Sequence, residues 1–478
     1  MINRVSSIID EKRMCFEEVN DKIWEYAETR FKEYNSSDLL CSVLEKEGFK
    51  VEKDIGDMAT AFIGSYGKGK PVIAILGEFD ALAGLSQEGG VSKQQPVIEK
   101  GNGHGCGHNI LGTASLAAVI GARKYMEENN ISGTIRYYGC PGEEGGSGKT
   151  YMVRDGAFDD VDIALSWHPG TVNSIKSVSS LANYQVYFRF KGRSSHAAAS
   201  PHLGRSALDA VELMNVGVNY LREHIIPEAR VHYAVTNTGG ISPNVVQASA
   251  EVLYLIRSPR ASQVDSIYKR IINIAKGAAL MTETEVEVIF DKACSNYIPN
   301  KVVEDVMFKY LKLLGGPKFK EEDFKFAKNI KRTLNNEDIE ASLALIGKAV
   351  GNENKSLVKA LRSEELCKNI LPFKHNVGVM PGSTDVGDVS WVVPTAELMV
   401  TCAAIGSPGH SWQIVSQGNT GIAHEGMLLA SKVMALAALE IFKNPELIKK
   451  AKEELKEKLQ GEEYKCPIPK GVKPAVKR

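Results

Sequence analysis

A short segment in which three potential metal ligands alternate with glycine is the first feature that could do chemistry. His104, Cys106 and His108 are each separated by one glycine. Glycine lets the backbone turn sharply, so neighbouring thiolate and imidazole groups can approach one ion. A structural zinc site is the alternative, but it typically uses about four nearby Cys or His ligands in paired motifs. The other donors lie far apart in the sequence, which favours a catalytic metal held by several loops.

Other side chains suited to metal binding or proton transfer follow short apolar runs elsewhere in the chain. In chain order they are Glu78 and Asp80, Glu143 and Glu144, His168, and His410. In open α/β sheets, sites form outside the carboxyl ends of the strands. If each run is such a strand, these side chains gather at one sheet edge with Cys106 and His108. A single histidine such as His168 or His410 is weak evidence by itself.

The adjacent Glu143 and Glu144 suggest proton transfer next to a metal. Adjacent side chains diverge, so one carboxylate can bind a metal while the other holds a water against the substrate. A solvated acidic turn is the alternative, but the apolar run before the pair and the glycines after it favour a function. The stretch continues into Gly148-Lys149-Thr150, where a phosphate-binding loop would need a glycine at position 143. That position is a glutamate, so a phosphate-binding loop is rejected.

Three further residues are candidates for contact with a substrate. His196 lies among small residues that would let a substrate or another chain approach closely, although an ordinary polar loop fits equally well. Arg257 carries a planar group that can clamp a carboxylate, but most arginines are solvated. Asn244, in the segment Pro-Asn-Val-Val, is a weaker candidate.

Short apolar runs at residues 71–76, 134–139, 162–166 and 398–405 predict the strands that position these groups. Each run has the length and composition of a strand buried in a parallel sheet. Segments with helical periodicity lie between or after the runs, and Asn109 is expected to cap a helix that follows it. This alternation predicts an α/β domain in which a mostly parallel sheet is flanked by helices.

The pattern then changes, which predicts a second domain inserted over residues 181–293. Alternating polar and apolar residues there indicate half-buried strands in the order β-α-β-α-β, with a further strand around residues 230–238. This order suits a small α+β, ferredoxin-like sheet with helices on one face. Residues 1–180 and 294–478 then form the first domain, with a helical insertion at residues 316–375.

Length and composition exclude several classes of protein. In the 478 residues, 58 Lys and Arg balance 58 Asp and Glu, which argues against a general nucleic-acid partner. No apolar run reaches the roughly 18 residues of a membrane span, and no signal peptide is recognised. The eight cysteines are scattered, so a reducing, cytoplasmic compartment is expected. Residues 465–478 are expected to be disordered or to form an arm.

Taken in order over residues 5–445, these motifs resemble the metal-dependent aminoacylase and carboxypeptidase superfamily. The most similar branch is that of the amidohydrolases, which includes hippurate, indole-acetyl-amino-acid and aminobenzoyl-glutamate hydrolases. The residues 316–375 and 382–388 look most like the group of aminobenzoyl-glutamate hydrolase B subunits. The motifs that carry the resemblance are His-Gly-Cys106-Gly-His108, Glu143-Glu144-Gly, His168-Pro-Gly and Ser195-His196-Ala-Ala.

The resemblance implies a catalytic domain that holds two divalent ions, zinc or manganese, in each subunit. Cys106 would bridge the two ions as a thiolate, a ligand compatible with either metal. His108 and His168 would complete one site. Glu144 and His410 would complete the other.

The resemblance also implies roles for the remaining candidates. Glu143 would act as general base and then as general acid, and Asp80 would orient a ligand. The inserted domain would be a lid that also mediates dimerisation, and its His196 would stabilise the oxyanion in its own or the partner subunit's site. Asn244 and Arg257 would hold the carboxylate of the substrate.

The implied reaction is hydrolysis of the amide bond of an N-acyl amino acid, most similar to aminobenzoyl-glutamate. One alternative is a dipeptidase for unusual dipeptides, with a β-alanyl group or a basic C-terminal residue. Another is a non-catalytic partner subunit of a hetero-oligomeric hydrolase. A homodimer, or a heterodimer with a related subunit, is implied. Glu78 stands where many relatives in the wider superfamily have a ligand histidine, so its role is open.

Overall fold

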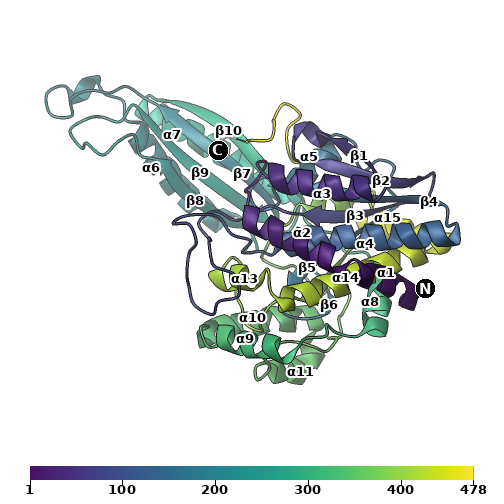
Figure 1. The fold of residues 1–478 in the computed structure, drawn as a ribbon. Coiled ribbons are helices and arrows are strands. Elements are labelled where there is room, and N and C mark those ends of the chain that lie inside the picture. Colours follow the sequence, from purple (N-terminus) through teal and green to yellow (C-terminus); the bar gives the residue numbers. More distant parts are fainter. Residues whose placement is uncertain (477–478) are drawn as a thin grey trace.

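The computed structural model describes residues 1–476, which form two β-sheets with flanking helices (Figure 1). The larger sheet has the strand order β1-β2-β4-β3-β5-β11-β6. Its strands are β1 (Lys50–Lys53), β2 (Phe62–Lys68), β3 (Val72–Glu78), β4 (Gly133–Cys140), β5 (Ile163–Gly170), β6 (Ser174–Ile175) and β11 (Thr395–Thr401). β4, β3, β5 and β11 run parallel and are the four strands that the apolar runs predicted. The predicted mostly parallel sheet is therefore confirmed.

The parallel strands are apolar throughout because both faces of the sheet are covered. Every residue of β3 is buried. Ile73 and Ile75 pack into one apolar core, whereas Val72, Ala74 and Leu76 pack into the core on the opposite face. Strands of this kind appear in a sequence as continuous apolar runs. The antiparallel strands β1, β2 and β6 are short or partly exposed, and the sequence pattern did not reveal them.

Helices on the two faces of the large sheet differ in size and number. The first core receives α1 (Ile2–Glu11), α2 (Arg13–Tyr26), α3 (Tyr34–Lys46), α4 (His108–Asn129), α8 (Lys301–Leu314), α14 (Gly421–Lys443) and α15 (Pro445–Leu459). The other core receives α5 (Gly148–Arg154) and α12 (Val386–Val392). The short α13 (Trp412–Gln417) follows the loop after β11. None of the helices in residues 1–476 combines the length and apolarity needed to cross a bilayer.

The start of α4 corrects the expected helix cap. The helix begins at His108, and its N-cap is Gly107 in a left-handed conformation. The Asn109 side chain instead donates hydrogen bonds to the Asn20 side chain and to the Gly418 carbonyl, both at 2.9 Å. Asn109 therefore ties α4 to neighbouring segments, and His108 occupies the first helical position.

The second sheet belongs to the inserted domain, called the lid below, and projects away from the large sheet (Figure 1). Its antiparallel strands have the order β10-β7-β9-β8. In chain order its elements are β7 (Ala182–Lys191), α6 (Ala207–Leu221), β8 (Arg230–Asn237), β9 (Ser249–Ser258), α7 (Ala261–Thr282) and β10 (Glu285–Cys294). This β-α-β-β-α-β order is the ferredoxin-like arrangement that the sequence predicted. The limits proposed for the two domains stay predictions.

Helices occupy much of the segment between α8 and α12. They are α9 (Glu321–Lys331), α10 (Asn336–Val350) and α11 (Lys355–Leu361). Leu343, Ile346 and Val350 of α10 pack with Val358 and Leu361 in a separate apolar cluster. These helices lie together below the β6 edge of the large sheet in Figure 1. The C-terminal segment is an arm rather than a disordered tail as far as residue 476: Ile468 is buried, and Val472 accepts a hydrogen bond from Arg154 at 2.7 Å.

Candidate functional site

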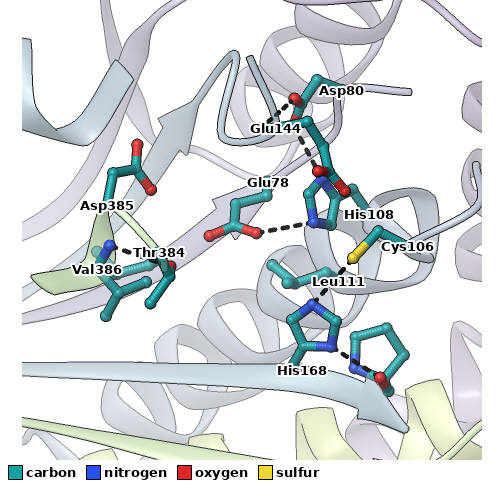
Figure 2. Close-up of polar contacts among 12 residues, drawn as sticks. Glu78, Asp80, Cys106, His108, Leu111, Glu144, His168, Thr384, Asp385 and Val386 are labelled. Carbon is teal, nitrogen blue, oxygen red and sulfur yellow. Dashed lines mark hydrogen bonds and ion pairs between the residues drawn. The ribbon is translucent and has the colours of Figure 1, made fainter. Parts of the chain in front are cut away.

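The carboxyl edge of the parallel strands gathers ligand-forming side chains from distant parts of the chain (Figure 2). Glu78 ends β3, and Asp80 follows it. The loop after β4 supplies Glu143 and Glu144, while His168 lies in β5. Cys106 and His108 lie at the start of α4, and His410 lies in the loop after β11.

The potential ligands form overlapping groups of three. Within each group, one possible ligand atom of every residue lies within 4.8 Å of the others. Cys106 belongs to two groups, one with His108 and His168 and one with Glu144 and His410. A third group consists of Glu78, His108 and Glu143. The thiol therefore lies between two sets of ligands, as a bridging ligand would.

The donor set and the close spacing of its atoms fit divalent metal ions. Two buried atoms face other potential ligands: His108 Nε2 lies 3.2 Å from Glu78 Oε2, and Glu144 Oε1 lies 3.1 Å from His410 Nε2. A bound cation would be held by such closely spaced imidazole and carboxylate groups. Thiolate, imidazole and carboxylate groups are the ligands that zinc uses in proteins.

Asp80 fixes the orientation of one imidazole. Its Oδ1 lies 2.9 Å from His108 Nδ1, and its Oδ2 accepts a hydrogen bond from the Glu144 backbone at 3.0 Å (Figure 2). Because Nδ1 is occupied, His108 presents Nε2 to the cluster. Carboxylates that hold the far nitrogen of a ligating histidine in this way fix both its tautomer and its ring orientation.

Unusual backbone conformations place two of these ligands. Gly107 has φ +77°, and a Cβ there would also lie 2.8 Å from Pro169 Cγ, so only glycine fits between Cys106 and His108. His410 has φ +57°, a strained conformation for a residue with a side chain, and its N–H donates to the Gly105 carbonyl at 2.8 Å. Strain of this kind is often concentrated at functional sites.

The charges of the cluster change the protonation of its members. Burial and the Glu144 carboxylate raise the pKa of the Cys106 thiol, but the imidazoles of His168 and His108 outweigh them, and the pKa falls to about 6. The thiolate form, which binds metals, is thereby favoured. Burial, together with the negative charges of Glu78 and Glu144, raises the pKa of Glu143 well above its ordinary value. A carboxyl group of raised pKa is suited to exchange protons near neutral pH.

A buried ion-pair cluster beside the site was missed by sequence reasoning. Lys149 has no exposed surface, and its Nζ lies 2.6 Å from Glu78 Oε1 and 2.7 Å from Asp385 Oδ1. The lysine is thus engaged by carboxylates, in agreement with the rejection of a phosphate-binding loop. Glu78 also lies 3.2 Å from His108 Nε2, which connects the cluster to the ligands. No sequence signal links Lys149 to Asp385, because 236 residues separate them.

His104 does not join the other two donors of its segment. Its Nε2 lies 3.0 Å from the Ile23 carbonyl, and it belongs to none of the three ligand groups within residues 1–476. Burial lowers its pKa to about 3, so the ring is neutral. The alternation with glycine therefore brings Cys106 and His108 to the cluster while His104 binds the backbone of α2.

The candidates for substrate contact lie at opposite ends of the lid. His196 and Asn244 occupy loops that contact each other at the tip, where Ala197 N donates to the Asn244 carbonyl at 2.9 Å. Arg257 lies at the other end of β9, where its Nη1 is 3.4 Å from Ser383 Oγ. β9 has 10 residues, and a strand of that length spans roughly 30 Å. One subunit therefore does not bring Asn244 and Arg257 to the same ligand.

Comparisons with known proteins show which proteins the chain resembles. A family model described as Peptidase family M20/M25/M40 matches residues 74–473. The chain is 52% identical over 473 residues to a protein of Escherichia coli (strain K12) named as the B subunit of p-aminobenzoyl-glutamate hydrolase, with 98% of each chain covered. It is 26% identical over 476 residues to the Xaa-Arg dipeptidase of Mus musculus, covering 96% of this chain and 93% of that one.

A solved structure shares the fold. It is that of a putative aminohydrolase from methicillin-resistant Staphylococcus aureus, which superposes with a TM-score of 0.61 at 16% sequence identity. The match covers 92% of this chain and 99% of the other. Both the large sheet and the lid therefore belong to an arrangement that is already known.

Proposed function

The chain belongs to peptidase family M20/M25/M40, and from that premise we propose that it hydrolyses p-aminobenzoyl-glutamate to p-aminobenzoate and glutamate. It is a metal-dependent amidohydrolase. The name of the relative that is 52% identical supports this substrate. The observation that carries the proposal is the ligand cluster around Cys106, with Glu143 beside it.

Two metal sites that share Cys106 are part of the proposal. One uses His108 and His168, and the other uses Glu144 and His410. The two groups of three residues around one thiol support this assignment for zinc or manganese. Bound divalent ions lower the pKa of a water and polarise a carbonyl.

Glu143 moves the proton in the proposed reaction. It is half-buried at the carboxyl edge of the sheet and belongs to the third ligand group, with Glu78 and His108. Its carboxylate takes a proton from the attacking water and then delivers it to the nitrogen of the leaving glutamate. General acid–base catalysis of this kind typically contributes about 10²–10⁴-fold.

Replacing Glu143 by glutamine tests this role. Glu143→Gln keeps the shape of the side chain but removes the proton acceptor, so we expect glutamate release to fall by at least about 100-fold. Metal content, measured by mass spectrometry, stays as in the wild type because Glu143 is outside the two proposed metal sites. Full activity in this variant would refute the assignment.

The lid supports an assembly in which subunits complete each other's sites. His196 is exposed at the tip of the lid, far from the cluster of its own chain. We propose that it stabilises the oxyanion in a partner subunit, while Arg257 and the partner's equivalent of Asn244 hold the substrate carboxylates. The partner is a second copy, or a related subunit, as the name of the E. coli relative suggests.

Subunit complementation separates the two kinds of assembly. His196→Ala and Glu143→Gln each inactivate a different component of the composite site. If a second copy is the partner, mixing the two inactive variants under exchange conditions restores up to about a quarter of the activity. If a related subunit is required, mixing restores nothing, and activity appears only when that subunit is supplied with the wild-type chain. Activity retained by His196→Ala alone would contradict the role of the lid.

Substrate choice is tested against the dipeptidase alternative. A panel that contains p-aminobenzoyl-glutamate, β-alanyl-lysine and dipeptides ending in arginine distinguishes an acidic from a basic leaving group. We expect glutamate release to dominate. Preference for the basic dipeptides would favour the activity named for the mouse relative.

A further inference from the structure

An apolar cavity of about 360 Å³ opens directly beside the ligand cluster. Cys106 and His168 line it on the side of the cluster, and Val172, Ile175 and Met399 line it farther away. Pockets for small organic molecules typically occupy roughly 300–1,000 Å³. A substrate whose carbonyl lies at the cluster can therefore place one of its two halves in this cavity.

One wall of the cavity comes from α10 in the helical insertion. Ser342, Leu345, Ile346 and Ala349 all line it. Their spacing of three, four and seven residues places them on one stripe of the helix. Leu345, a large apolar side chain, is 40% exposed because it lines the cavity and is not packed into a core. Leu343, Ile346 and Val350 pack into the apolar cluster of the insertion, and the last two of them also line the cavity. The insertion thus places α10 between this apolar cluster and the cavity.

The chemistry of the wall excludes a charged group. Lys176 lines the cavity, but its Nζ lies 2.5 Å from Glu397 Oε1, so its charge is compensated. A glutamate leaving group carries two carboxylates, which would lose their hydration without gaining a free cation there. The half of the substrate that fits is therefore the uncharged acyl half.

Resting on the proposed function, we propose that this cavity binds the acyl group and that α10 makes the enzyme selective for an uncharged, ring-sized acyl group. A ring fills the space between α10 and β11 and replaces water along the apolar wall. A small acyl group such as acetyl leaves most of that wall in contact with water. Selectivity therefore depends on residues of the insertion that lie outside the metal cluster.

A bulky side chain on the cavity stripe tests the proposal. Ala349→Phe fills the cavity, whereas Ala344→Phe makes the same change at an exposed position of the same helix that does not line it. With metal-loaded full-length protein, calorimetry measures the binding of p-aminobenzoate. We expect the Kd to rise at least tenfold in Ala349→Phe and less than twofold in Ala344→Phe. Equal affinity in both variants overturns the proposal.

Kinetics with two substrates of the same leaving group provide the second readout. We expect Ala349→Phe to lower kcat/KM at least tenfold for p-aminobenzoyl-glutamate and less than threefold for acetyl-glutamate. An equal loss for both substrates overturns the acyl-site assignment while leaving hydrolysis itself established. If the wild type releases glutamate from neither substrate, the proposed function fails, and p-aminobenzoate binding still decides the cavity. Should Ala349→Phe fail to fold, Ser342→Leu fills the same cavity from the same stripe.

Discussion

Removing the Lys149 ammonium leaves two buried carboxylates without their cation. Lys149 is completely buried between Glu78 and Asp385, and their negative charges raise its pKa well above the ordinary value despite its burial. The lysine is therefore charged. Breaking a buried ion pair by removing one partner typically costs about 3–5 kcal/mol, because the remaining charge stays buried and uncompensated. With two carboxylates affected, we expect Lys149→Met to reduce the free energy of unfolding by about 4–5 kcal/mol.

Urea denaturation, followed by circular dichroism and by tryptophan fluorescence, measures this loss. Lys309→Met is the matched control, because Lys309 is half exposed and pairs with Glu440 at the surface. An exposed pair contributes about 0–1 kcal/mol, so the control changes stability little. Adding Asp385→Asn to Lys149→Met removes one uncompensated charge, and we expect it to recover part of the stability. If Lys149→Met costs no more than Lys309→Met, the account of the buried cluster is wrong.

Three further changes test the metal ligands, a buried acid and a close contact. Cys106→Ser should reduce the content of both metals, measured by mass spectrometry, while exposed Cys15→Ser should not; unchanged metal would exclude a bridging thiolate. Burial raises the pKa of Asp388 to about 6. An unfolded aspartate has a pKa near 3.9. Between about pH 4 and 6, therefore, Asp388 holds a proton in the folded protein that it has lost in the unfolded chain. As pH rises through that window, the free energy of unfolding of the wild type should fall by up to about 3 kcal/mol relative to that of Asp388→Asn. Urea denaturation at pH 4.5 and at pH 7 measures this difference. The same difference at both pH values would contradict the account. A Cβ on Gly426 would lie 2.4 Å from Cys402 Sγ, so Gly426→Ala should cost about 1–3 kcal/mol, measured as a lower Tm. An unchanged Tm would show that α14 shifts freely.

Local patterns were sufficient to predict the parallel strands and the gathering of potential ligands at one edge of the sheet. Strands buried on both faces must be apolar along their length, so the runs at β3, β4, β5 and β11 were visible in the sequence. The carboxyl ends of parallel strands share one edge, which brings side chains such as Glu78 and His168 together. The glycines around Cys106 and after Glu144 also indicated that the backbone turns sharply at these positions. The lid was equally visible, because its half-buried strands alternate with period two.

Other features depend on contacts between segments that are far apart in the chain, and no local pattern encodes them. In the sequence, His104 resembles a metal ligand and Asn109 resembles a helix cap. In the structure the His104 ring instead contacts the Ile23 carbonyl, and the Asn109 side chain donates to the Gly418 carbonyl. The C-terminal arm is ordered by contacts that its composition does not reveal.

The sequence by itself predicted the parallel sheet, the ferredoxin-like lid and the potential metal ligands at the sheet edge, because residue type, spacing or periodicity within a short window indicates each of them. Only the tertiary structure decided that Lys149 lies between Glu78 and Asp385, that α10 walls the cavity beside Cys106, and that His196 lies far from its own cluster. These facts depend on how loops and an insertion fold back over the sheet. Packing contacts throughout the molecule determine where these segments lie, and the spacing of residues in the sequence does not show those contacts.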